Sequence, residues 1–149
     1  MIKITESADN AKTLRFLKEL PVELTKAIRL GFYNSGKLLT QDLQKDMRQP
    51  KSGKKYKIYK NSKPKIHTAS APSETPAVRS GAFSKSVSFE VRGNRTLEFG
   101  SKNGPEYAVF LEKGTSKMEA RKPFKRTTLK NSQKIKSLID TEIKKAIEK

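Results

Sequence analysis

The chain of 149 residues contains 33 Lys and Arg against 15 Asp and Glu, no cysteine and one histidine, for a formal net charge of +18. This length fits a single domain, residues 1–149, with a core of its own, and the missing cysteines exclude disulfides and thiolate metal sites. No apolar run approaches the ~20 residues of a membrane span and no signal-peptide segment opens the chain, so we expect a soluble protein made inside the cell.

Two helical patterns occupy the first third of the chain. Residues 9–20 predict a short amphipathic helix, and Pro21 begins a longer helix that runs to about Arg48. Along the longer helix, the positions expected on the core face recur at spacings of three and four, the helical period: Leu24, Ile28, Phe32, Ser35, Leu39, Leu43 and Met47. Gly31 and Gly36 each weaken this helix by up to ~1 kcal/mol relative to Ala, so we expect them to mark close packing against another element.

A basic, extended arm follows at residues 49–79. Residues 48–73 carry eight basic side chains and no acid. Alternation around Asn61-Ser62 predicts a hairpin with an imperfect turn signal, and the Pro- and Ser-rich residues 69–80 predict a loop that is mobile alone and ordered against a partner. The arm residues expected to contact a neighbouring subunit or partner are Lys54, Lys55, Tyr56, Lys57, Tyr59, Lys60, Lys65 and His67.

Residues 80–101 predict a short helical segment followed by a second hairpin. Ser80 is placed to cap one or two helical turns that contain Phe83. Apolar residues then alternate with polar ones on both sides of the turn at Gly93-Asn94: Val87, Phe89, Val91, Leu97 and Phe99. This is the firmest hairpin signal in the sequence.

Residues 107–124 combine an apolar run, one acid, a chain break and a Pro-Phe pair. The run at 107–113 fits a short helix or a strand, because seven residues are too few for periodicity to decide. Gly114-Thr115 supplies a turn with positive φ, and Pro123-Phe124 suits the first turn of a helix. We predict that Glu112 forms an ion pair with Arg121 that fixes this turn to the C-terminal helix. The alternative is a surface acid worth about 0–1 kcal/mol.

The chain from Pro123 onward is predicted to be helical, with an apolar stripe formed by Ile135, Leu138, Ile139, Ile143, Ala146 and Ile147. The order of elements predicts an α+β fold. In it, a small antiparallel sheet packs against a long N-terminal helix and a C-terminal helix, and the arm extends from them.

The sequence predicts no catalytic, metal or cofactor site. His67 has no acid within six residues, and Asp42 and Asp46 lie four residues apart with no further ligand in reach. Walker, dinucleotide-binding and zincin motifs do not occur. We therefore expect no enzyme, and a nuclease or toxin-like activity in particular lacks a catalytic cluster.

Three segments, in this order, resemble the neck or tail-completion family of tailed double-stranded DNA phages, also described as head–tail joining proteins or minor tail components. They are His67-Thr68-Ala69-Ser70-Ala71-Pro72 with Pro76-Ala77-Val78; Ser80-Gly81 with Phe83; and Tyr107-Ala108 with Leu111-Glu112-Lys113-Gly114-Thr115-Ser116-Lys117-Met118 and Ala120-Arg121-Lys122-Pro123-Phe124. The resemblance spans roughly residues 20–147. Lys113 and Lys122 depart from the family pattern, which affects the geometry of the turn but keeps its components.

The resemblance implies a structural virion protein without catalysis or a small-molecule substrate, located in the head–tail neck and assembled in the cytoplasm of the bacterial host. Its implied partners are copies of itself in a ring, of six or twelve subunits in this family, and the portal, adaptor or stopper and tail-terminator or tail-tube proteins. DNA passing through the ring is a further implied contact, and no membrane is involved.

The alternative is a nonspecific DNA-binding protein that acts through its basic arm. Lysine makes up 25 of the 33 basic residues, which favours diffuse electrostatic contact over sequence readout. Tyr56 and Tyr59 could stack on bases, but in a strand they would lie on opposite faces. One buried and one exposed tyrosine explains the pattern equally well.

Overall fold

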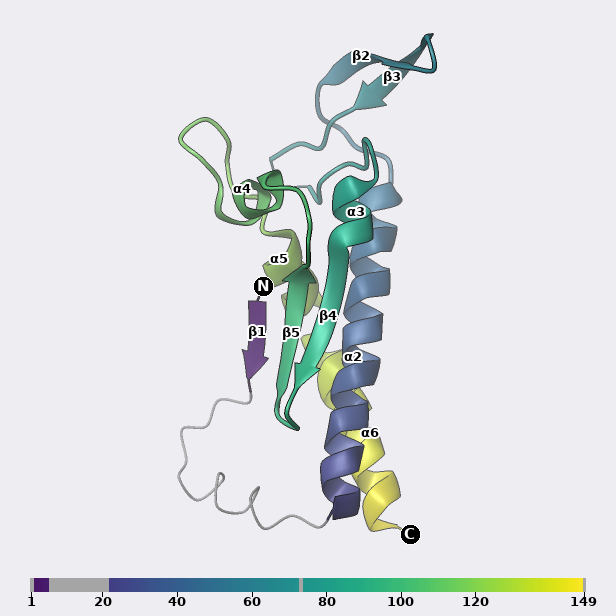
Figure 1. Cartoon of the computed structure of the whole chain (residues 1–149), viewed down its shortest axis with the longest axis vertical. Helices are drawn as coiled ribbons and strands as arrows, with labels where there is room; N and C mark the ends of the chain where they lie inside the picture. The colour runs from purple at the N-terminus through teal and green to yellow at the C-terminus, as the bar shows by residue number, and fades with distance from the viewer. Residues whose placement is uncertain (1, 6–21, 73, 149) are drawn as a thin grey trace.

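The computed structural model describes residues 2–5, 22–72 and 74–148, and it confirms the predicted α+β fold (Figure 1). In chain order its elements are β1 (Ile2–Thr5), α2 (Val22–Arg48), β2 (Lys55–Lys60), β3 (Lys63–Thr68), α3 (Ala82–Ser86), β4 (Val87–Arg92), β5 (Thr96–Ser101), α4 (Tyr107–Lys113), α5 (Pro123–Lys130) and α6 (Ser132–Ile147). The helix predicted at residues 9–20 lies outside the described residues.

The long helix α2 packs against α6 and against the sheet (Figure 1). Of the predicted stripe, Phe32, Ser35, Leu39, Leu43 and Met47 are buried as expected, whereas Leu24 and Ile28 are only half-buried. Its two glycines lie where neighbours come closest. A Cβ at Gly31 would stand 2.8 Å from the Cα of Ile139 in α6, and one at Gly36 would overlap the ring of Phe89 in β4. The expectation of close packing is therefore confirmed.

The sheet of the body has three antiparallel strands in the order β1-β5-β4. The hairpin β4–β5 forms as predicted, with Phe89 opposite Phe99 and Val91 opposite Leu97. Leu97 and Phe99 are completely buried in the core. Strand β1 was not predicted. It pairs along β5, with Ile2 opposite Phe99.

The C-terminal segment is two helices rather than the single helix predicted. The break lies at Asn131, which is buried and donates from its side-chain amide to Asp42 in α2 at 2.7 Å. Lys130 also pairs with Asp42, at 3.1 Å, and with Asp46, at 2.9 Å. Burial raises the pKa of Asp42, but the hydrogen bonds from Asn131 and Lys130 outweigh burial and hold it below its usual value. These bonds join the α5–α6 junction to α2.

Two short predicted segments are helices in the structure, α4 and α3. The run at 107–113 is the helix α4 rather than a strand. Helix α3 begins at Ala82, and the residue at its N-cap position is Gly81, with φ of 85°, rather than Ser80. The Ser80 hydroxyl oxygen still accepts the N–H of Ala82, at 3.3 Å. The predicted cap is therefore wrong by one position, because Gly81 adopts the left-handed backbone that begins the helix.

Candidate interaction site: the projecting hairpin and the pocket at its base

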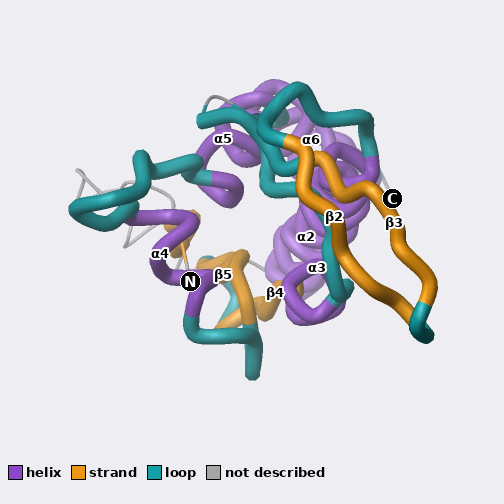
Figure 2. The backbone as a smooth tube through the Cα atoms, turned by 90° about the horizontal axis from the view of Figure 1, so that it is seen from above, coloured by secondary structure: helices purple, strands orange, loops and turns teal. Residues whose placement is uncertain are grey.

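Strands β2 and β3 form a hairpin that stands away from the body (Figures 1 and 2). They pair only with each other, as a sheet separate from β1-β5-β4. The predicted turn is confirmed, since Asn61 and Ser62 both take positive φ, at 50° and 62°, as two-residue hairpin turns require. Within the hairpin, all side chains are exposed except Ile58, His67 and Thr68, which are half-buried. The hairpin therefore contributes little to the core.

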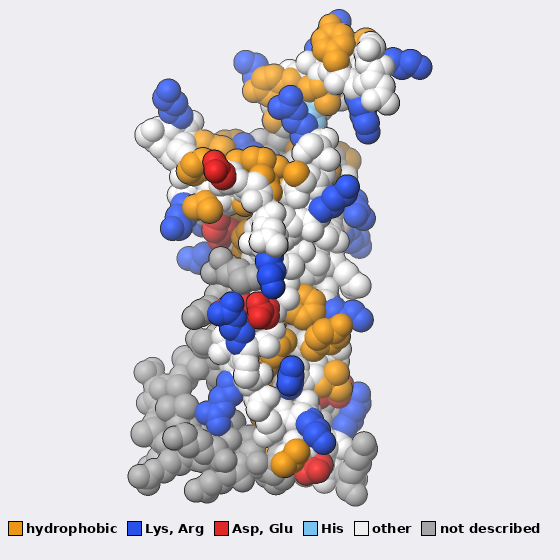
Figure 3. Space-filling view, in the orientation of Figure 1, with side chains coloured by type: hydrophobic (Ala, Val, Ile, Leu, Met, Phe, Trp, Pro, Cys, Tyr) orange, Lys and Arg blue, Asp and Glu red, His pale blue; other side chains and the backbone are white. Residues whose placement is uncertain are grey.

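The two faces of the hairpin differ in chemistry. Because paired residues of antiparallel strands point to the same side, the pairs Tyr59–Pro64 and Lys57–Ile66 place an apolar strip on one face. Tyr59 is 70% exposed and Ile66 is 60% exposed. Figure 3 shows such apolar side chains among lysines on this projection, at the top of the view. We call Tyr59, Pro64 and Ile66 the apolar strip.

The opposite face, which we call the cationic face, carries three lysines and the histidine, whereas Lys55 and Lys57 share the face of the apolar strip. The register gathers Tyr56, Ile58, Lys60, Lys63, Lys65 and His67 there. Tyr56 is 49% exposed, and the Lys54 ammonium lies 5.8 Å from the centre of its ring. The prediction that Tyr56 and Tyr59 lie on opposite faces is confirmed. The alternative in which one of them is buried is wrong, because the hairpin does not pack on the body.

Backbone and side-chain bonds join the two chain segments that lead into and out of the hairpin. The Lys54 carbonyl accepts the N–H of Ala69 at 2.9 Å. The Glu74 carboxylate accepts the Ser52 hydroxyl at 2.7 Å and the N–H groups of Ser52 and Ala71 at 3.1 and 2.9 Å. The Ser52 hydroxyl, followed by these N–H groups, lowers the pKa of Glu74 to about 2. Of the predicted arm 49–79, only residues 55–68 project, while the following loop lies on the body.

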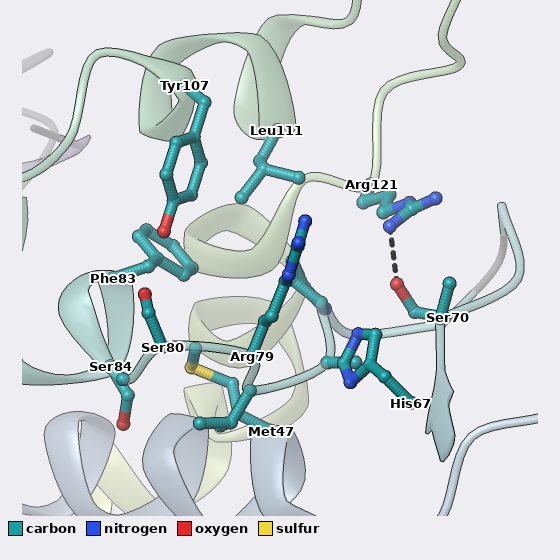
Figure 4. A pocket seen from close by; sticks show the side chains of 15 residues that line it. Met47, His67, Ser70, Arg79, Ser80, Phe83, Ser84, Tyr107, Leu111 and Arg121 are labelled. Carbon is teal, nitrogen blue, oxygen red and sulfur yellow. Dashed lines mark hydrogen bonds between the residues drawn. The ribbon is translucent and has the colours of Figure 1, made fainter. Parts of the chain in front are cut away.

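A pocket of about 540 Å³ opens where this loop meets α3 and α4 (Figure 4). Its apolar wall includes Met47, Val78, Phe83, Leu111 and the ring of Tyr107. Its polar lining comes from His67, Ser70, Arg79, Ser80 and Arg121, and no acid lines it. The sequence analysis did not predict this pocket, because its lining comes from segments far apart in the chain.

The predicted ion pair between Glu112 and Arg121 is wrong. The Glu112 carboxylate instead accepts the N–H groups of Phe124 at 3.1 Å and Lys125 at 3.3 Å. Helix N-termini expose unsatisfied N–H groups that attract a carboxylate, and the first turn of α5 offers such groups within reach. The Arg121 guanidinium donates to the Ser70 hydroxyl in the loop below the hairpin. Glu112 therefore joins α4 to α5. The sequence predicted a link from Glu112 to the C-terminal helix, but the link is made by backbone hydrogen bonds and not by an ion pair with Arg121.

The other predicted turn residues lie as expected. Gly114 has φ of 79°, and the N–H of Thr115 donates to the Met118 carbonyl at 2.8 Å. Pro123 opens α5, and Phe124 is buried with its ring edge-to-face on Phe83 and Phe99. The segment 107–124 therefore joins the sheet core to the C-terminal helices.

Comparisons with models of known protein families, with curated proteins and with solved structures find no match. Within residues 2–5, 22–72 and 74–148, no group of three or more His, Asp and Glu side chains is placed to hold a metal ion. Among the helices of these residues, none combines the length and the apolar composition that a membrane span requires.

Proposed function

We propose that this protein is a structural subunit of a phage head–tail neck, which joins or completes the connector–tail interface as a ring. The observation that carries the proposal is the hairpin, whose strands pair only with each other and whose apolar strip is exposed. A lone two-stranded hairpin is marginally stable in water. Its exposed Tyr59 and Ile66 therefore gain most if a neighbouring subunit or ring covers them.

The energetics favour contact with protein. Full burial of a large apolar side chain stabilises by about 1.5–3 kcal/mol, so covering Tyr59 and Ile66 contributes several kcal/mol per hairpin. A closed ring repeats that contact in every copy. The bonds between Glu74 and Ser52 and between Arg121 and Ser70 hold the base of the hairpin, which limits the ordering cost of docking.

Nonspecific DNA binding is the second candidate, and the cationic face of the hairpin favours it. Lys60, Lys63 and Lys65 share that face with the exposed Tyr56 ring, a combination suited to phosphates and base stacking. It leaves the apolar strip unexplained, because Pro64 and Ile66 have nothing to offer a phosphate backbone. We therefore place the protein partner on the strip.

The decisive variant removes only the part that projects. Because the Lys54 carbonyl and the Ala69 N–H already form a hydrogen bond, residues 55–68 can be replaced by Asn-Gly, which closes a two-residue turn. This deletion keeps the Arg121–Ser70 bond that holds the loop to the body, the Glu74 bond within the loop and the buried Pro76. We expect cooperative unfolding close to that of the full chain but no assembly, measured by light scattering and by the protein's presence in purified virions.

Two matched variants separate the candidates. Tyr59→Ser with Ile66→Ser should abolish ring formation and incorporation into virions, whereas the triple variant Lys60→Gln, Lys63→Gln and Lys65→Gln should leave both intact. A DNA-binding protein would show the reverse pattern, with tight affinity that falls steeply with salt and is lost in the triple variant. Full infectivity of virions carrying the hairpin deletion would overturn the neck proposal.

A further inference from the structure

We propose that the pocket at the base of the hairpin binds an acidic segment of a partner protein. Arg79 and Arg121 would hold an Asp or Glu carboxylate of that segment, and an adjacent apolar side chain would lie against Phe83 and Leu111. This inference goes beyond the neck function and does not depend on it, since it rests on the pocket rather than on the hairpin.

Arg79 and Arg121 both line this pocket, and no acidic side chain lines it. Figure 4 shows the Arg79 side chain extending from its loop toward Leu111 and Arg121. Arg79 makes no hydrogen bond or ion pair with another residue that the structure describes. Arg121 donates to Ser70, but its Nε is buried and has no hydrogen-bond partner in the described chain. The pocket therefore holds two positive charges that no acidic lining residue neutralises.

A carboxylate fits these donors best. A guanidinium presents its N–H groups in a planar fork that matches the two oxygens of a carboxylate. The Ser80 hydroxyl and the His67 ring line the same pocket and offer further polar contacts. The volume of about 540 Å³ lies within the range of about 300–1,000 Å³ found for ligand pockets and is large enough for two side chains.

The apolar wall favours a peptide over a nucleic acid. Met47, Val78 and Leu111 line the pocket beside the arginines, and burial of aliphatic surface contributes only when the ligand is apolar as well. An Asp or Glu next to Leu, Ile or Phe supplies both parts. A phosphodiester supplies the charge alone.

The experiment uses the full chain and a short probe peptide, acetyl-Gly-Leu-Asp-Leu-Gly-amide, followed by ¹⁵N–¹H NMR. We expect saturable shifts at residues that line the pocket, and an affinity that Arg79→Gln lowers about tenfold, the effect of losing ~1.4 kcal/mol of binding. Arg79 is exposed and makes no hydrogen bond or ion pair with another described residue, so this variant should remain folded. Arg95→Gln, in the β4–β5 turn far from the pocket, is the matched control.

Three outcomes would overturn the proposal. The first is the absence of saturable shifts at the pocket with millimolar probe. The second is equal binding of the same peptide with Asn in place of Asp, which would make the pocket merely apolar. The third is a short DNA duplex that shifts the pocket residues and loses this effect in Arg79→Gln. None of these outcomes would affect ring formation, so a failure here is distinct from a failure of the neck proposal.

Discussion

The helix-and-sheet body buries its large core side chains, whereas the β2–β3 hairpin leaves its apolar side chains exposed. In the body, Leu39, Leu43 and Phe99 are fully removed from water, whereas Tyr59 and Ile66 in the hairpin are mostly exposed. An apolar side chain left in water adds nothing to the stability of the monomer. The contrast separates the part of the chain that folds for itself from the part that is available to a partner.

The largest expected effect tests the body. Leu43→Ala removes a fully buried side chain from the face of α2 that meets the core, and we expect a loss of about 2–5 kcal/mol in the free energy of unfolding. Urea denaturation measures it. Ile66→Ala in the hairpin is the control, with an expected change within about 0.5 kcal/mol. Similar losses in the two variants would erase the distinction between body and hairpin.

A smaller effect is expected where two helices approach most closely. In Gly31→Ala the new Cβ meets the backbone of Ile139 in α6, and overpacking of this kind costs about 1–3 kcal/mol. The better helix propensity of Ala returns up to ~1 kcal/mol, so we expect a net loss. Lys37→Ala, at an exposed position of the same helix, is the control. A Gly31→Ala protein more stable than the wild type would show that α2 and α6 are not tightly packed.

The next effect concerns the hydrogen bonds between the Glu112 carboxylate and the first turn of α5. Glu112→Ala removes the acceptor of two N–H groups at the start of this helix, and we expect a loss of about 1 kcal/mol, as for other helix caps. Thermal unfolding measures it. Glu112→Ala should still be destabilising in an Arg121→Gln background. If the cost disappears in that background, the two residues act as a pair after all.

The smallest effect is expected at the base of the hairpin and depends on pH. The folded-state pKa of Glu74, about 2, lies below its ordinary value of 4.5. The ionised carboxylate therefore stabilises the fold fully above about pH 4.5, and this contribution is lost as the pH falls toward 2.

At pH 7 the wild type should accordingly melt at a higher temperature than Glu74→Gln. This difference in melting temperature should disappear as the pH falls from 4.5 to about 2. Glu119→Gln, at an exposed position away from the hairpin base, serves as the control. A gap that persists unchanged at pH 2 would mean that ionisation of Glu74 does not hold the loop.

Most of the fold could be predicted because its signals are local. The spacing of apolar residues defined α2, and turn residues defined both hairpins, including the left-handed pair Asn61 and Ser62. Strand β1 was missed because four residues carry no periodic signal, and its partner β5 lies far along the chain. The break at Asn131 was missed because the bond that holds its side chain is made with Asp42, in another helix.

The site could be predicted only in part. The basic hairpin is visible in the sequence, but its two faces depend on which residues pair across the strands, such as Tyr59 with Pro64. The charges of Glu112 and Arg121 suggested an ion pair, yet the carboxylate met backbone N–H groups that only the placement of α5 brings into reach.

The sequence by itself determined the positions of the long helix, the two hairpins and the cationic arm, because these depend on periodicity, turn chemistry and charge within short stretches of chain. Only the tertiary structure decided that the hairpin leaves the body and that a pocket with two arginines forms at its base. Those features arise where residues distant in sequence meet, so their chemistry depends on packing and not on any local pattern.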